Sequence, residues 1–194
     1  MHHIYHTHGF ILSSRNTGEA NKMFTIYTRE MGLVRAMAQG IRLHKSKLRF
    51  TLQDFSYINV DLVKGRELWR VTSAKHISSF PFARSSTPSL LLITRISKLL
   101  ERLCTGESPS ENIFNDFIQA LYLLDDENMT PHSREALELH LVLRIMNSLG
   151  YIGDSDILSK YLSSSFDYNK TEMLLKERQS IIAYINKALN ESQL

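Results

Sequence analysis

The spacing of apolar residues along the chain changes its period near residue 80. From Gly9 to about Ile77, β-branched and aromatic residues alternate with polar ones in short runs that end at turn-forming residues. In the run from Phe55 to Val63, every second residue from Ile58 onward is apolar. Such alternation turns one face of a β-strand toward a core and the other toward solvent. The first part of the chain is therefore predicted to consist of β-strands.

Five strands are predicted in this part, at Phe10–Ser14, Met23–Thr28, Leu33–Ala38, Phe55–Val63 and Leu68–Ala74. Lys64–Glu67 forms a predicted hairpin turn before the last strand, and residues 39–52 form a loop after the third. An open sheet, the alternative, would leave two edges to protect, whereas a small closed barrel leaves none. We therefore expect a five-stranded β-barrel of the OB type.

Beyond Ser79–Phe82 the apolar residues recur at helical spacing. Four amphipathic helices are predicted: one from Thr87-Pro88 to Gly106, one after the capping box Ser108–Glu111, one from Thr130-Pro131 to Gly150, and one over Leu174–Leu189. Helices of this kind can bury a core of their own as a bundle. The predicted class is α+β, with a barrel domain at residues 1–80 and an α-helical domain at residues 81–194.

Lys and Arg residues are concentrated in the first part of the chain. Residues 1–80 hold 12 Lys and Arg against 5 Asp and Glu, a net charge of +7, whereas residues 81–194 hold 11 against 15, a net charge of −4. Excess positive charge on a small domain attracts polyanions, and nucleic acid is the commonest polyanion in a cytoplasm. Improved solubility is the alternative interpretation of the same charge.

Several classes of protein are excluded by the sequence. The longest aliphatic run, Leu90–Ile93, is far shorter than the about 20 residues of a membrane span. The first residues lack the pattern of a secretory signal, so a cytoplasmic protein without membrane contact is expected. The one cysteine, Cys104, excludes an internal disulfide and a zinc site of several thiolates, and its place on an apolar helical stripe predicts a buried, unreactive thiol.

No catalytic motif accompanies these elements. The chain has no GxSxG elbow, HExxH, GxxxxGK[ST] or GxGxxG sequence, so an enzyme is the least favoured class. The histidines near the start could in principle bind a transition metal, with His6 and His8 on one face of a strand; the full set is His2, His3, His6 and His8. They have no carboxylate or thiolate partner nearby in the sequence, and no metal or other cofactor is predicted.

The richest feature is a cationic segment in the predicted loop after the third strand, which we call the basic loop (residues 40–49). It holds a histidine and four cations: Arg42, Lys45, Lys47 and Arg49. Neighbouring elements add Arg15, Lys22, Arg29 and Arg35, and Arg35 is predicted on the strand face opposite Val34 and Ala36. A cationic groove on a small barrel is typical of single-strand nucleic-acid binding. A solvated connector is the alternative.

Aromatic residues could supply stacking surfaces for bases. Tyr5, Tyr27 and Tyr57 are the candidates, and core packing is the equally weighted alternative for Tyr27 and Tyr57. Phe24 and Phe55 are expected in the core.

These segments resemble the amino-terminal domain of the RecO recombination mediator family. The matching stretches are Gly9–Arg15 with Gly18–Asn21, Thr28–Arg35, and Ala38–Arg42 with Lys45–Arg49 and Leu52–Phe55. Gln39 and Asp54 stand where the family has Lys and Pro. In the helical part, Leu139–Leu143 followed by Leu149–Tyr151 is similar to the family's helix that ends in an LGY turn.

The resemblance implies an OB-fold followed by a helical domain, in a bacterial, nucleoid-associated protein of DNA repair by homologous recombination. Family members bind single- and double-stranded DNA, anneal complementary strands, and help load recombinase onto DNA covered by single-stranded-DNA-binding protein. The implied partners are the acidic tail of that protein and the ring-forming protein RecR. Many members have a four-cysteine zinc module after the LGY turn; here Ile152–Asp156 contain no cysteine, and no zinc is expected.

The predicted mechanism makes no covalent bond. Cations neutralise phosphates on two strands, which lowers the cost of bringing the strands together. The predicted DNA-binding residues are Arg15, Arg35, Arg42, Lys45, Lys47 and Arg49. A groove between helices, rimmed by Arg95, Lys98 or Arg102, is predicted to accept an acidic-hydrophobic peptide. The alternatives are a general OB-type binder of single strands, including RNA, and a helical adaptor without DNA activity.

Overall fold

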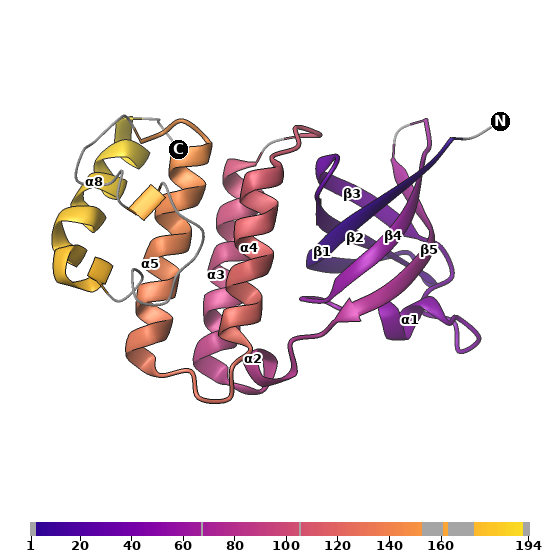
Figure 1. Cartoon of the computed structure of the whole chain (residues 1–194). Helices are drawn as coiled ribbons and strands as arrows, with labels where there is room; N and C mark the ends of the chain where they lie inside the picture. The colour runs from indigo at the N-terminus through magenta and orange to yellow at the C-terminus, as the bar shows by residue number, and fades with distance from the viewer. Residues whose placement is uncertain (1–2, 67, 105, 153–160, 163–172, 192–194) are drawn as a thin grey trace. The chain divides into compact units, whose positions relative to one another are not determined.

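Strands form the first part of the chain in the computed structural model: β1 at Ile4–Thr17, β2 at Asn21–Thr28, β3 at Gly32–Ala38, β4 at Tyr57–Lys64 and β5 at Trp69–Ser78. They close into a barrel in the order β1-β2-β3-β5-β4 (Figure 1). The β3–β5 pair is parallel and the other pairs are antiparallel. The predicted α+β class, with an OB-type five-stranded barrel followed by a helical region, is confirmed.

The structure describes residues 3–66, 68–104, 106–152, 161–162 and 173–191. The chain divides into two compact units, which are treated separately below. Unit 1 comprises residues 1–80 and 93–111, and unit 2 comprises residues 81–92 and 112–194. Unit 1 thus holds the whole predicted barrel domain together with residues 93–111, and the predicted boundary after residue 80 stays a prediction.

The first strand is longer than its predicted span, Phe10–Ser14, because its two halves pair with different neighbours. Its first half pairs with β4 and its second half with β2. The register shifts between Ile11 and Ser13, where a bulge lets the strand bend around the barrel. The fifth strand likewise runs on past Ala74 to Ser78.

Alternation along the strands fills the barrel. In β3, Val34 and Ala36 are fully buried while Arg35 between them is exposed, as predicted. The core also contains Phe24 and Trp69, and its buried members are Ile11, Phe24, Ile26, Val34, Ala36, Ala38, Ile41, Leu52, Ile58, Val60, Leu62, Trp69 and Val71. Burial of this much apolar surface stabilises the barrel at about 25 cal/mol per Å².

The loop between β3 and β4 contains a helix that the sequence did not predict. The helix, α1, spans Leu48–Thr51 and includes the last two residues of the basic loop. Leu48 packs against the barrel core, which anchors the end of the loop.

Helices follow the barrel: α2 at Pro81–Ser85, α3 at Thr87–Leu103, α4 at Glu111–Leu124 and α5 at Pro131–Ser148. The boundary between the units falls within α3, after Leu92. Thr130 caps α5 by accepting a hydrogen bond from the backbone N–H of Ser133 at 3.1 Å, as expected of a Thr-Pro start. The second predicted helix, expected after the capping box Ser108–Glu111, is α4, which begins at Glu111.

The last predicted helix begins later along the chain than its apolar pattern, Leu174–Leu189, suggested. Leu175–Glu177 form a short 3₁₀ helix, η1, and only then does α8 run from Arg178 to Glu191. Gly153–Asp156, where the family's zinc module would begin, lie outside the described residues. Among the residues that the structure describes, no helix combines the length and apolar character that a membrane crossing requires.

Candidate nucleic-acid interface

Two of the predicted cations meet on the outer face of the barrel. Arg15 lies near the end of β1, opposite Met23 of β2, and Arg35 lies on β3, opposite Thr25 of β2. Both line one hollow of about 240 Å³, whose lining residues are Ser13, Ser14, Arg15, Met23, Thr25, Arg35 and Glu101. We call this the arginine hollow. Two guanidinium groups and three hydroxyl-bearing residues give it the donors that a phosphate group accepts from.

The basic loop is joined to the turn between β1 and β2. The backbone N–H of Arg42 donates to the carbonyl of Ala20 at 3.0 Å, and its Nη1 donates to the carbonyl of Gly18 at 3.2 Å. The backbone N–H of Gly40 donates to Oδ1 of Asn21 at 2.9 Å. That turn directly follows the end of β1, which holds Arg15. These bonds therefore place the start of the basic loop on the same side of the barrel as that strand end.

The other three cations of the basic loop differ in their exposure and in their contacts. Lys45 and Lys47 are exposed. The guanidinium of Arg49 lies over the ring of Phe50, 4.5 Å from its centroid, and Phe50 is 67% exposed. An exposed ring stacked with an arginine is a surface on which a base can pack. Phe50 was not among the predicted stacking residues, although its position directly after Arg49 at the end of a cationic segment was the signal that the sequence offered.

The tyrosines predicted to stack are in different environments. Tyr27 is only 1% exposed, so its stacking role was wrong and the core alternative holds. Burial, and to a lesser degree Cys104, raises the pKa of the Tyr27 phenol well above its ordinary value. Tyr57 is half-buried and bonds His8 at 2.8 Å, while Tyr5 is 37% exposed and packs edge-on against Trp69. Tyr5 is therefore the most accessible of the three.

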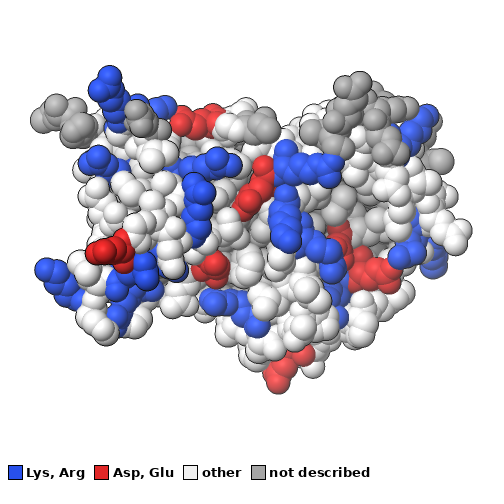
Figure 2. Space-filling model, turned by 180° about the vertical axis from the view of Figure 1, so that it is seen from behind, with Lys and Arg blue, Asp and Glu red and all other residues white. Residues whose placement is uncertain are grey.

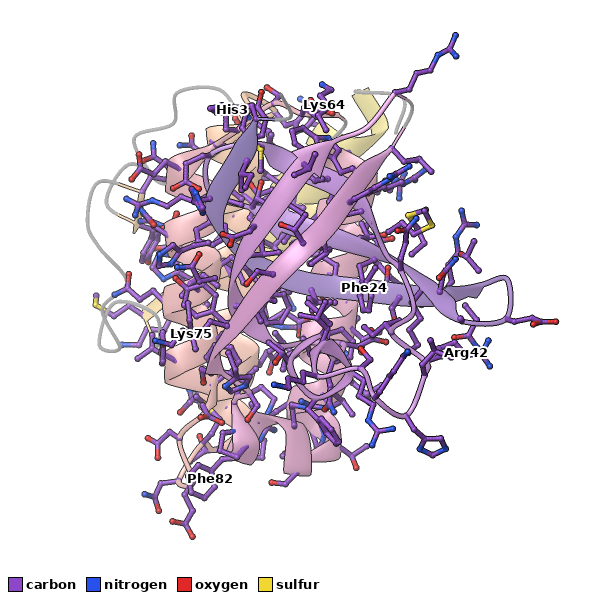
Figure 3. All side chains as sticks on the ribbon, turned by 90° about the vertical axis from the view of Figure 1, so that its right-hand side faces the viewer. His3, Phe24, Arg42, Lys64, Lys75 and Phe82 are labelled. Atoms are coloured by element: carbon purple, nitrogen blue, oxygen red, sulfur yellow. The ribbon has the colours of Figure 1, made fainter. Side chains whose placement is uncertain are left out.

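Phe24 lies in the barrel interior as predicted, whereas Phe55 is half-buried and stacks with Phe10 at a centroid distance of 6.4 Å (Figure 3). Burial also raises the pKa of the Cys104 thiol, which agrees with the predicted inert role.

Exposed cations also lie on β5. Arg70 and Lys75 of β5 are exposed, and Figure 3 shows Lys75 and Arg42 on opposite sides. Figure 2 shows one face of the molecule, on which blue side chains are more frequent than red over the barrel at the left of the view. Positive charge therefore extends beyond the predicted set, while the arginine hollow and the basic loop together hold all six predicted DNA-binding residues.

Three glutamates of residues 101–111 contact the barrel within unit 1. Glu101 accepts a hydrogen bond from Ser13 at 2.7 Å, and Glu111 accepts one from Nε of Arg29 at 3.0 Å. The ion pair with Glu111 raises the pKa of the Arg29 guanidinium. Gly32 of β3 lies where the backbone of Ser108 packs closely on the barrel. Its φ is +67°, and an added Cβ would lie 2.4 Å from the carbonyl oxygen of Ser108, so this position requires glycine.

Glu107 makes the third contact with the barrel. It accepts hydrogen bonds from Nζ of Lys64 at 2.8 Å and from Nε1 of Trp69 at 2.7 Å. The bonds from Lys64 and Trp69 lower the pKa of the Glu107 carboxyl.

This lowered pKa makes the stability of unit 1 depend on pH. Glu107 contributes stability above its unfolded pKa, near 4.5, and that contribution is lost as the pH falls through the lower folded value. We expect the urea midpoint of wild-type unit 1 to fall between about pH 5 and 3 more steeply than that of Glu107→Gln. The chain has one tryptophan, so Trp69 fluorescence measures this unit directly. Equal pH dependence in the two proteins would contradict the assignment.

The predicted peptide-binding cations lie on α3. Arg95, Lys98 and Arg102 are all exposed and belong to the part of the helix that is in unit 1. An apolar groove within the described part of unit 2 lies between α5 and α8 and is lined in part by Leu139 and Ile182. The predicted groove beside the three cations stays a prediction.

The described histidines near the start have different partners, and His3 packs edge-on against Tyr5. His6 bonds Asp61 at 2.6 Å and His8 bonds Tyr57 at 2.8 Å. In the described part of the chain no three His, Cys, Asp or Glu side chains are grouped so that they could hold a metal ion. His2 lies outside the described residues.

Comparison with known proteins agrees with this architecture. Residues 1–80 match the family described as "Recombination protein O N terminal". A protein named DNA repair protein RecO from Pelotomaculum thermopropionicum is 30% identical over 148 residues, which are 76% of this chain and 56% of that protein. Proteins of the same name from Desulfitobacterium hafniense and Rubrobacter xylanophilus are 29% and 33% identical, over 76% and 63% of this chain and 52% and 49% of theirs.

The chain thus spans about half the length of the curated relatives it matches. The match to residues 1–80 covers the five strands, the arginine hollow's two arginines and the entire basic loop. The chain belongs to the RecO family of DNA repair proteins, and residues 1–80 are its amino-terminal RecO domain.

Proposed function

We propose that this protein binds single- and double-stranded DNA through the arginine hollow and the basic loop, and that it accelerates annealing of complementary strands. The main support is that six cations from β1, β3 and the basic loop lie in the barrel domain that matches the family. One of them, Arg42, is hydrogen-bonded to the β1–β2 turn. Strands 2 and 3, with the loops between strands 1 and 2 and between strands 4 and 5, form the nucleic-acid face of many OB-folds, and the basic loop is bonded to the first of these loops. Cations on that face neutralise the phosphates of two strands and release their counterions, so the strands repel each other less.

The test is the rate at which two dye-labelled complementary oligonucleotides anneal with and without the protein at low salt. We expect a strong acceleration, together with a log–log salt slope of about −3 for single strands if four phosphates are contacted. Binding without acceleration would favour the general single-strand binder, and a slope near zero would contradict the electrostatic mechanism. Absence of DNA affinity alongside salt-insensitive partner binding would favour the adaptor.

The mediator role adds two protein partners to this activity. We propose that the protein acts in homologous recombination in the bacterial cytoplasm, at the nucleoid, with the acidic tail of single-stranded-DNA-binding protein and RecR as partners in loading recombinase. The family membership supports this role. We assign the tail peptide to the exposed stripe of α3 formed by Arg95, Lys98 and Arg102, because their spacing puts three cations on one helix face.

Charge reversal on α3 tests the peptide site. Arg95→Glu with Arg102→Glu is expected to abolish binding of the tail peptide, because its carboxylates would then meet like charges. Arg70→Glu with Lys75→Glu makes the same change of charge on β5 and is the matched control. Fluorescence anisotropy of a labelled peptide measures both. Unchanged affinity in the α3 variant, or equal loss in the control, would remove the assignment.

A further inference from the structure

The arginine hollow contains a negative charge of its own. Glu101 of α3 lines it together with Arg15 and Arg35, and its Oε1 accepts a hydrogen bond from Oγ of Ser13 at 2.7 Å. That bond joins residues 88 positions apart in the sequence, from α3 to β1. The Glu101 side chain is thus held at the hollow by a specific contact on the barrel, within unit 1.

The groups in the hollow match what one phosphate group needs. Arg15 and Arg35 provide charged donors from two strands, and Ser13 and Thr25 provide hydroxyl groups on the same strand face. A water molecule's share of liquid volume is about 30 Å³, so a hollow of about 240 Å³ has room for an anion with part of its hydration shell. A carboxylate in the same hollow offsets one of the two positive charges and repels an entering anion.

We propose that the hollow is a subsite for a single backbone phosphate of the nucleic acid, and that Glu101 is an internal counter-charge that weakens its occupancy. A phosphate entering the hollow must displace the Glu101 carboxylate from the Ser13 hydroxyl or bind beside it against charge repulsion. A protein that pairs strands must release the product, and a built-in competitor limits how tightly one phosphate is held. This inference rests on the proposed function, because it assumes that the β1–β3 face binds nucleic acid.

The variant that isolates the charge is Glu101→Gln, whose amide oxygen can still accept from Ser13. We expect it to bind a fluorescein-labelled oligothymidine about tenfold more tightly than wild type at low salt, since one close like charge has been removed. The difference should shrink as salt is raised, because the Debye length falls to about 8 Å near 0.15 M. The salt slope should steepen by about 0.7, the value of one further phosphate contact.

Two further proteins make the result specific to the hollow. Glu127→Gln changes the net charge equally at an exposed position of unit 2 and is expected to leave the affinity within about twofold of wild type. In Glu101→Gln combined with Arg35→Gln, the gain from removing the carboxylate should largely disappear, because one of the two arginines it opposes is gone. Circular dichroism shows whether each variant is folded.

The outcomes separate this inference from the function on which it rests. If wild type does not bind the oligonucleotide at all, the proposed function fails. If wild type binds and Glu101→Gln behaves like Glu127→Gln, DNA binding stands and the counter-charge is refuted. If the gain in oligonucleotide affinity persists in the double variant, the Glu101 charge acts on the nucleic acid as a whole and not on one phosphate in the hollow. The single-phosphate subsite is then overturned.

Discussion

Charge reversal of the basic loop is expected to abolish annealing acceleration. The variant replaces Arg42, Lys45, Lys47 and Arg49 with Glu. Each cation lost removes a phosphate contact, and each glutamate adds repulsion to both strands. If all four cations contact phosphates, the log–log salt slope for single strands should become less negative by about 3. The affinity at low salt should fall by more than about 100-fold. Dye-labelled annealing and anisotropy titrations over a salt series measure the two effects.

A second charge-reversal variant separates location from total charge. Arg66, Arg70 and Lys75 are exposed cations that are not among the six predicted DNA-binding residues, and Lys75 lies across the barrel from Arg42 (Figure 3). Their reversal should leave most of the annealing rate intact. Because Arg42 also bonds the β1–β2 turn, a milder variant retains it and changes Lys45, Lys47 and Arg49 to Gln. Loss of activity in the control equal to that in the loop variant would place the interface elsewhere.

Removing the Asp116 carboxylate is expected to have the largest effect on stability. Arg144 of α5 donates to Asp116 of α4 through Nε and Nη2, both at 2.8 Å, and the two side chains are only 15% and 11% exposed. Asp116→Ala leaves the guanidinium charge without its partner carboxylate in a mostly buried site. We expect the free energy of unfolding of unit 2 to fall by about 3 kcal/mol.

The unfolding experiment can separate the two units. Trp69 lies in unit 1, whereas circular dichroism also follows the helices of unit 2, so the variant should shift the circular-dichroism midpoint in urea and leave the Trp69 transition nearly unchanged. Asp116→Leu with Arg144→Met removes both charges and should recover much of the loss, because apolar residues of similar volume often replace a buried pair without cost. An Asp116→Ala midpoint equal to wild type would show that the pair contributes little.

The strands could be predicted because their alternation is local. In β3 the exposed Arg35 stands between buried Val34 and Ala36, and three residues are enough to see it. The ends of β1 were missed because its pairing with both β2 and β4 depends on the closed barrel. The residues that extend β1 toward Ile4 include histidines, which give no apolar signal.

The candidate site was predictable to the extent that it depends on charge. Arg15, Arg35 and the loop cations follow from sequence, whereas Glu101 enters the hollow through a contact that spans much of the chain. Tyr27 could not be assigned for the same reason: residues near Cys104 cover the strand face that would otherwise meet solvent. Contacts of this range are set by tertiary packing, which periodicity does not report.

The chain leaves unit 1 after Phe80 and returns to it at Ile93, so this unit is not a continuous stretch of sequence. During synthesis the five strands emerge first, but Glu101, Glu107 and Glu111 follow only after the start of α3. At about 5–20 residues per second, a barrel on the ribosome would wait about 2 to 6 s for these three carboxylates. In that interval Lys64, Arg29 and the arginine hollow would face the polyanionic surface of the ribosome without their internal counter-charges.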